Sequence, residues 1–72
     1  MERSFRQYIH FFINDSSDYG AIARIAQSDQ DFPADGVPAK EIHRYMKESA
    51  LYSRHILACG ELYRKYLRIA EE

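Results

Sequence analysis

Asp29, Asp31 and Asp35, the last followed by Gly36, place three carboxylates in one short stretch of the chain. A calcium loop needs oxygen ligands at alternating positions before its glycine, and it needs a distal glutamate. Pro33 occupies one of the required positions. The spacing therefore predicts no metal site, and we interpret these carboxylates as solvated loop groups that also cap helices.

His10, His43 and His55 lie in three different segments and form no pair at metal-ligand spacing. Cys59 is the only cysteine, and it falls in an apolar stripe, where a thiol packs as a small hydrophobic group. The chain has no Ser-His-Asp order, no glycine-rich phosphate loop and no pair of active-site carboxylates. We therefore predict no catalytic residue, no metal and no cofactor, and we do not expect an enzyme.

A basic cluster near the C-terminus is formed by Arg54, Arg64, Lys65 and Arg68, with Tyr63 available to stack beside them. Such a group can bind nucleic acid. It can equally complement the dipole of a final helix and pair with nearby glutamates. Nucleic-acid modules usually have a pI above about 9, whereas this chain has a pI of about 6.3. Nucleic-acid binding is therefore the disfavoured alternative.

The first segment is apolar beyond one helical face. One face is formed at i, i+3, i+4 and i+7 by Phe5, Tyr8, Ile9 and Phe12. Phe11 and Ile13 fall outside that face, so we expect at least one of them to be exposed. An exposed apolar side chain in a small domain can mark a partner surface or a weak homodimer contact. We therefore predict a protein-protein interaction module, either a monomer or a weak homodimer, with Phe11, Ile13 and the basic cluster as candidate partner-binding residues.

The spacing of apolar residues predicts five short helices, over residues 4–13, 19–28, 38–49, 52–59 and 61–71. Ser4 is a candidate N-cap, and Pro38 suits a first helical turn. Gly20 lies in the first turn of the second predicted helix, where a glycine is tolerated. Gly60 costs about 1 kcal/mol inside a helix, so we expect a bend or a cap there.

With 72 residues, 46% of them apolar, the chain has room for one domain, residues 1–72, with one core. No strand is predicted, so the fold class is all-α: a compact bundle of four to five short helices. The predicted core consists of Phe5, Tyr8, Phe12, Ile25, Phe32, Ile42, Tyr45, Tyr52, Ile56, Leu62 and Tyr66.

Net charge, cysteine content and targeting signals indicate where in the cell the protein is expected. The formal net charge is −1, with three basic and six acidic residues in 1–36 and seven basic and five acidic residues in 37–72. A single cysteine allows no internal disulfide. The first residues do not read as a signal peptide, and nothing approaches the ~20 apolar residues of a membrane span. We therefore expect a cytoplasmic protein with no membrane partner.

A pattern spread over nearly the whole chain resembles the YozE family of small uncharacterised proteins of Gram-positive bacteria. The residues that carry it are Ser4, Phe5, Tyr8, Ala23, Ala26, Asp29, Phe32, Pro33, Glu41, Ile42, Tyr45, Ala50, Tyr52, Glu61 and Tyr66. The resemblance implies a SAM-like helical fold. The chain departs from the pattern at Cys59-Gly60, where the family has an aromatic residue and an aspartate, and at Tyr63, where it has a tryptophan. The resemblance implies no activity, because fold alone assigns none.

Overall fold

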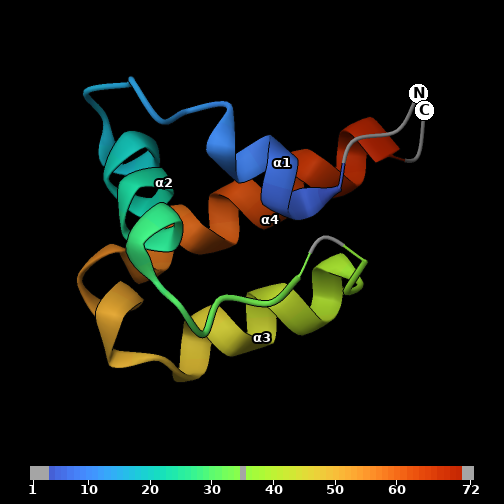
Figure 1. The fold of residues 1–72 in the computed structure, drawn as a ribbon. Coiled ribbons are helices and arrows are strands. Elements are labelled where there is room, and N and C mark those ends of the chain that lie inside the picture. The colour runs from blue at the N-terminus through green and yellow to red at the C-terminus, as the bar shows by residue number, and fades with distance from the viewer. Residues whose placement is uncertain (1–3, 35, 71–72) are drawn as a thin grey trace.

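The computed structural model describes residues 4–34 and 36–70. Its elements in chain order are α1 (Phe5–His10), α2 (Asp18–Ser28), α3 (Ala39–Glu48), the 3-10 helix η1 (Ala50–His55) and α4 (Ile56–Ala70). In Figure 1, α4 lies behind α1, α3 lies below them, and α2 stands at the left. α4 contacts every other element. The described residues form no strand, so the predicted all-α bundle is confirmed.

α1 begins where the sequence predicts and ends earlier. The Ser4 hydroxyl accepts a hydrogen bond from the Gln7 backbone N–H at 3.1 Å, while the Gln7 side chain accepts from the Ser4 N–H at 3.3 Å. This reciprocal pair is a capping box. After His10 the backbone tightens into i→i−3 bonds, from Phe12 to Ile9 and from Ile13 to His10. The predicted helix over 4–13 therefore ends as a regular α-helix at His10, and the remainder is a series of turns.

The predicted break at Gly60 is wrong, because α4 continues through it from Ile56 to Ala70. The glycine does not take a positive φ, and its neighbours Cys59 and Leu62 are fully buried. Packing of that kind outweighs a propensity cost of about 1 kcal/mol. The change of direction comes instead at Ser49, whose hydroxyl accepts a hydrogen bond from the Leu51 N–H at 3.3 Å and caps η1.

Ile56 was predicted in the core and is 38% exposed. The prediction continued an α-helical stripe from Tyr52, but residues 50–55 form a 3-10 helix. A 3-10 helix has three residues per turn, so a side chain four positions after Tyr52 points to a different side. Tyr52 itself is fully buried, and so are Cys59 and Leu62 on the following helix.

The core lies where all five elements meet. Of the predicted set, Phe5, Phe32, Ile42, Tyr52 and Leu62 are buried, and Tyr8, Phe12, Ile25, Tyr45 and Tyr66 are partly buried against them. The core also contains Ile9, Ile22, Ala23, Ala26, Met46, Ala58 and Cys59. The longest helix, α4, has 15 residues. None of the helices formed by the described residues is long and apolar enough to cross a membrane.

Candidate interaction surface

The segment between α1 and α2 is held in place by one arginine of α2. Arg24 Nη1 donates to the backbone carbonyls of Ile13 and Asp15, both at 3.1 Å. Gly20 allows this close approach, because a Cβ atom there would overlap the Asp15 carbonyl group. Gly20 is thus required by the packing and is more than merely tolerated. The segment in turn holds Phe11 at the surface, where its side chain is 66% exposed.

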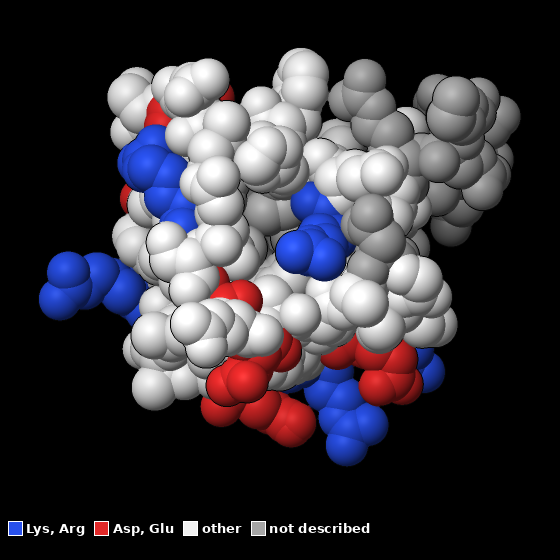
Figure 2. Space-filling view, viewed as in Figure 1, with Lys and Arg blue, Asp and Glu red and all other residues white. Residues whose placement is uncertain are grey.

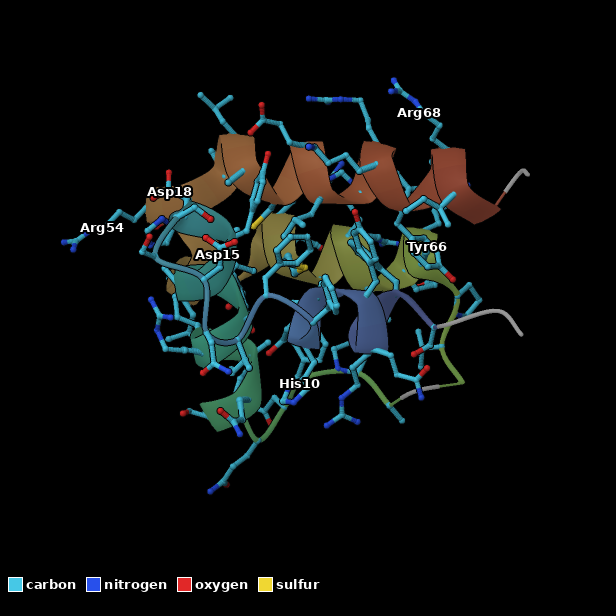
Figure 3. All side chains as sticks on the ribbon, turned by 90° about the horizontal axis from the view of Figure 1, so that it is seen from above. His10, Asp15, Asp18, Arg54, Tyr66 and Arg68 are labelled. Carbon is cyan, nitrogen blue, oxygen red and sulfur yellow. The ribbon has the colours of Figure 1, made fainter. Side chains whose placement is uncertain are left out.

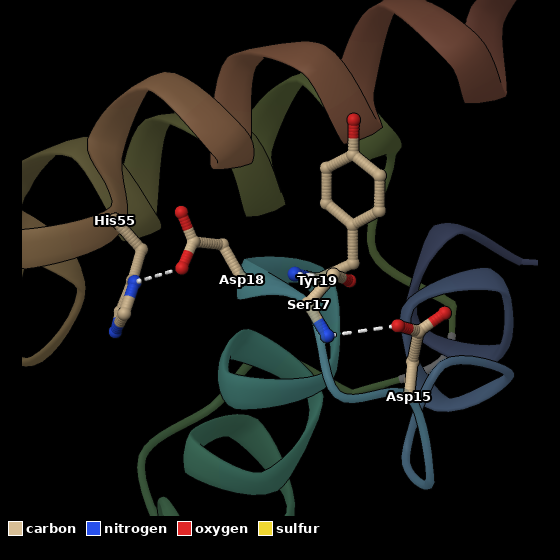
Figure 4. Close-up of polar contacts among 5 residues, drawn as sticks. All are labelled: Asp15, Ser17, Asp18, Tyr19 and His55. Atoms are coloured by element: carbon tan, nitrogen blue, oxygen red, sulfur yellow. Dashed lines mark hydrogen bonds and ion pairs between the residues drawn. The ribbon is translucent and has the colours of Figure 1, made fainter.

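Polar contacts at the start of α2 position Tyr19. The Asp15 carboxylate accepts from the Ser17 N–H at 2.8 Å, and the Ser17 hydroxyl accepts from the Tyr19 N–H at 3.2 Å. The hydrogen bonds from Ser17 lower the pKa of the Asp15 carboxyl. His55 Nδ1 lies 3.5 Å from Asp18 Oδ1 and connects α2 to the end of η1 (Figure 4). Tyr19 therefore projects toward α4 from a fixed backbone.

A row of aromatic rings runs from the end of α1 to α4. The Phe11 and Phe12 ring centroids are 5.6 Å apart with an interplanar angle of 86°, and those of Phe12 and Tyr19 are 5.4 Å apart. Lys65 Nζ lies 5.5 Å from the centre of the Tyr19 ring, within the range of a cation-π contact. The Tyr19 hydroxyl donates to Glu61 Oε1 at 3.3 Å. We call these five residues the aromatic-basic face.

The aromatic-basic face combines the apolar and the basic residues that were predicted as two separate surfaces. Phe11 was predicted as part of an apolar surface and Lys65 as part of a basic one, and Phe12 and Tyr19 connect them. Partial burial raises the pKa of Tyr19, and the Glu61 carboxylate raises it further, while Arg64 acts in the opposite direction. The Tyr19 hydroxyl therefore stays neutral and keeps its hydrogen bond to Glu61.

The other predicted partner-binding residues lie in different environments. Ile13 is partly buried and packs against the core, so it adds little exposed area. Arg54 is exposed on η1, and Figure 3 places it at the opposite end of the molecule from Arg68. The four basic residues therefore do not form one patch: Arg64, Lys65 and Arg68 share the second half of α4, and Arg54 stands apart.

The histidines do not come together. His43 stacks on Tyr63 with ring centroids 4.3 Å apart and an interplanar angle of 18°, so Tyr63 packs against α3. Burial lowers the pKa of His43, and the neighbouring cations Lys47 and Arg64 lower it further.

Within the described part of the chain, no group of three acidic, histidine or cysteine side chains is arranged to hold a metal ion. Asp35 lies outside the described residues.

Asp29 has a role that the sequence analysis did not predict. Its carboxylate accepts hydrogen bonds from the hydroxyls of Tyr45 at 2.6 Å and Tyr52 at 3.1 Å, and from the Asp31 N–H at 3.0 Å. Burial opposes ionisation of Asp29, but these three donors outweigh it and lower its pKa. Asp29 therefore ties the end of α2 to α3 and η1, and it is not simply a solvated carboxylate.

Acidic and basic side chains are unevenly distributed on the face seen in Figure 1. Figure 2 shows most of the acidic side chains of this face at the lower edge, over α3, with basic side chains among them, and the other basic side chains lie singly. This face is therefore no basic strip of the kind that follows a nucleic-acid backbone. Arg68, on α4, points away from this face in Figure 3.

A family model described as the YozE SAM-like fold matches residues 4–68. The chain belongs to the YozE family. The match spans α1, α2, α3, η1 and all of α4 except its last two residues, and it includes the Asp29, Tyr45 and Tyr52 contacts that hold this YozE-family domain together. No curated protein matches the chain. Solved structures likewise gave no match. Function therefore has to be argued from the surface of the domain.

Proposed function

We propose that this YozE-family domain is a protein-protein interaction module that binds an acidic segment of a partner through its aromatic-basic face. The observation that carries the proposal is Phe11, which is 66% exposed although its ring packs edge-on against Phe12. A solvent-exposed aromatic ring held by its neighbours is suited to anchor a partner, because little side-chain freedom remains to be lost on binding.

The size of the exposed ring makes the anchor energetically useful. Covering the exposed part of a phenylalanine side chain removes on the order of 100 Å² of apolar surface from water, which is worth about 2–3 kcal/mol. Lys65 lies beside this ring system, and Arg64 and Arg68 are exposed on the same helix. Their charge favours an acidic partner and raises the rate of its association.

Site-specific photo-crosslinking tests the proposal. A photoreactive phenylalanine replaces Phe11 in one sample and Leu57 in a matched control, since Leu57 is 83% exposed but belongs to no ring cluster. We expect protein adducts in lysate of the source cells from position 11 and not from position 57. The adducts should persist after nuclease treatment and should be lost when Lys65→Glu is added. Equal adducts from both positions would refute a specific face.

Sedimentation at several protein concentrations distinguishes a weak homodimer formed through the same face from a complex with a different protein. Phe11→Asp should shift a self-associating protein toward the monomer, whereas Leu57→Asp should leave the distribution unchanged. A monomer at all concentrations, together with position-11 adducts to another protein, supports a hetero-partner. Neither substitution should lower the melting temperature by much, because both side chains are exposed.

The alternative function is weak nucleic-acid binding. The observation that favours it is the grouping of Arg64, Lys65 and Arg68 on α4 near the Tyr19 ring, because aromatic rings beside cations can stack bases. Fluorescence anisotropy with a single-stranded oligonucleotide at low salt measures it directly. Binding that weakens steeply with salt and is lost in Lys65→Glu would support this function over the protein partner.

A further inference from the structure

Glu61 is the acidic member of the aromatic-basic face, and it lies about one turn of α4 before two exposed cations. Lys65 follows it by four positions and Arg64 by three, so both can meet it on the helix surface. A glutamate placed four residues before a lysine has the better orientation for an ion pair, because it also suits the helix dipole. Helix geometry therefore favours ion pairs from Glu61 to its neighbours on α4.

The structure shows Glu61 in a different contact. Its Oε1 atom accepts a hydrogen bond from the Tyr19 hydroxyl at 3.3 Å. Figure 4 shows the Tyr19 ring extending from the start of α2 toward α4. In the described part of α4, no ion pair joins Glu61 to Lys65 or Arg64. The carboxylate is thus bound by a side chain of another helix.

Tyr19 is able to hold Glu61 because its own position is fixed. Its backbone N–H donates to the Ser17 hydroxyl at 3.2 Å, and its ring packs edge-on against Phe12 at 5.4 Å. Lys65 Nζ lies 5.5 Å from the centre of the same ring. The cation therefore contacts the face of the ring and the carboxylate contacts its hydroxyl, so one side chain engages the two charges at different points.

We propose that Tyr19 is a positioning residue whose hydroxyl holds the Glu61 carboxylate away from Lys65 and Arg64, so that these two cations bind a carboxylate of the partner. The inference rests on the function proposed above, in which the aromatic-basic face binds an acidic segment. A Glu61 side chain released from Tyr19 turns toward the cations of its own helix. It then competes with the partner as an anion of high effective concentration.

The proposal predicts that the effects of two substitutions depend on each other. Tyr19→Phe keeps the ring and removes the hydroxyl, so Glu61 pairs with the cations and partner binding weakens. Two helix-surface ion pairs correspond to a loss of about two- to fivefold in affinity. Glu61→Gln removes the competing charge and should bind at least as tightly as the wild type. Once it is present, Tyr19→Phe should have no further effect.

Amide NMR titration of the whole chain at low salt measures these affinities. The probe is a short synthetic peptide of alternating leucine and glutamate, and the same peptide with glutamine for glutamate is its uncharged control. We expect the acidic peptide to shift the amide signals of Phe11 and Lys65 and to bind Tyr19→Phe about two- to fivefold more weakly than the wild type. It should bind Glu61→Gln and the double variant equally.

Tyr63→Phe is the matched control, because it removes a tyrosine hydroxyl from α4 while keeping a ring that stacks on His43. It should leave the affinity for the acidic peptide unchanged. The Tyr19 ring is retained in Tyr19→Phe, so this variant is expected to fold, and the melting temperature of each variant verifies folding before the titration.

Two results would overturn the positioning role and leave the proposed function standing. Tyr19→Phe could bind the acidic peptide as tightly as the wild type, or it could weaken binding equally with Glu61 and with glutamine at that position. The second result would mean that the hydroxyl contacts the peptide itself. If no variant bound the acidic peptide, or if the uncharged peptide bound as tightly, the proposed function would fail and this inference with it.

Discussion

Gly20→Ala tests whether the segment after α1 really presses against α2. A Cβ atom at Gly20 would overlap the carbonyl oxygen of Asp15 and come within 3.1 Å of Arg24 Nη1. The carbonyl belongs to the backbone and accepts from Arg24 at 3.1 Å, as the Ile13 carbonyl also does. It can move only if these hydrogen bonds lengthen.

Three contributions set the expected size of the effect. Alanine gains about 1 kcal/mol of helix propensity over glycine. Overpacking costs about 1–3 kcal/mol, and the two strained hydrogen bonds from Arg24 add about 0.5–1.5 kcal/mol each. The sum is a net loss of about 1–5 kcal/mol from a domain whose total stability is about 4–11 kcal/mol, at about 0.05–0.15 kcal/mol per residue. For a domain of this size, each kcal/mol lowers the melting temperature by about 4–8 °C.

Gly60→Ala is the matched control, because it makes the same chemical change inside α4. The nearest atom to its added Cβ is Arg64 Nη1 at 3.5 Å, an ordinary contact. We expect it to raise the melting temperature by about 4–8 °C through helix propensity alone. Thermal unfolding followed by far-UV circular dichroism measures both variants. If Gly20→Ala also melted higher than the wild type, the packing described for Asp15 would be wrong.

Three further substitutions or reactions test the interior. Asp29→Ala removes the acceptor for Tyr45 and Tyr52 and should lower the free energy of unfolding by about 2–4 kcal/mol in urea titrations. The pKa of Asp29 is lowered below its ordinary value of 3.8. The contribution of the ionised carboxylate to the free energy of unfolding is therefore present above that pH and is lost as the pH falls below it. The difference in unfolding free energy between Asp29→Ala and the wild type should therefore become smaller in acid, and a difference that does not change with pH would contradict this. Burial raises the pKa of Cys59 to about 11, so a thiol reagent at about pH 8 should modify it only as fast as the domain unfolds; rapid modification of the native protein would contradict its burial. Phe32→Ala should cost about 3–5 kcal/mol, and a melt like that of the wild type would show that Phe32 does not anchor its loop.

The helices and part of the core were predictable because they depend on local spacing. The apolar periodicity and the Ser4 cap place α1, α2 and α3 to within a few residues. The errors at Gly60 and Ile56 have different origins: at Gly60 the propensity cost of glycine was given more weight than packing, and at Ile56 α-helical geometry was assumed from Tyr52 onward. The sequence has no strong signal for a 3-10 helix, and the Ser49 cap at which this element begins was not predicted.

The candidate surface was only partly predictable, because adjacency between distant segments is a tertiary property. Phe11 and Lys65 were singled out individually, but their connection depends on the position of Tyr19, which Gly20 and Arg24 fix through the preceding turn. Asp29 was missed for a similar reason. Its two partners lie 16 and 23 residues further along the chain, although the sequence analysis named all three residues among those that carry the resemblance to the YozE family.

Exposure alone does not distinguish Phe11 from other apolar side chains on the surface, since Leu57 is more exposed. Phe11 differs because a series of ring contacts connects it to the core. Ring contacts lead from the buried Phe5 to Tyr66 at 5.2 Å, from Tyr66 to Tyr8 at 5.7 Å, and from Tyr8 to Phe12 at 5.4 Å.

Phe12, at the surface end of these contacts, is the ring on which Phe11 packs. We propose that this contact restricts the rotamers of Phe11 before any partner arrives, so that less entropy remains to oppose binding. Loosening the support should therefore weaken binding even when Phe11 itself is unchanged. Tyr8→Ala should reduce position-11 crosslinking in a domain that still folds, whereas a side chain that is merely exposed, such as Leu57, has no such dependence on the core.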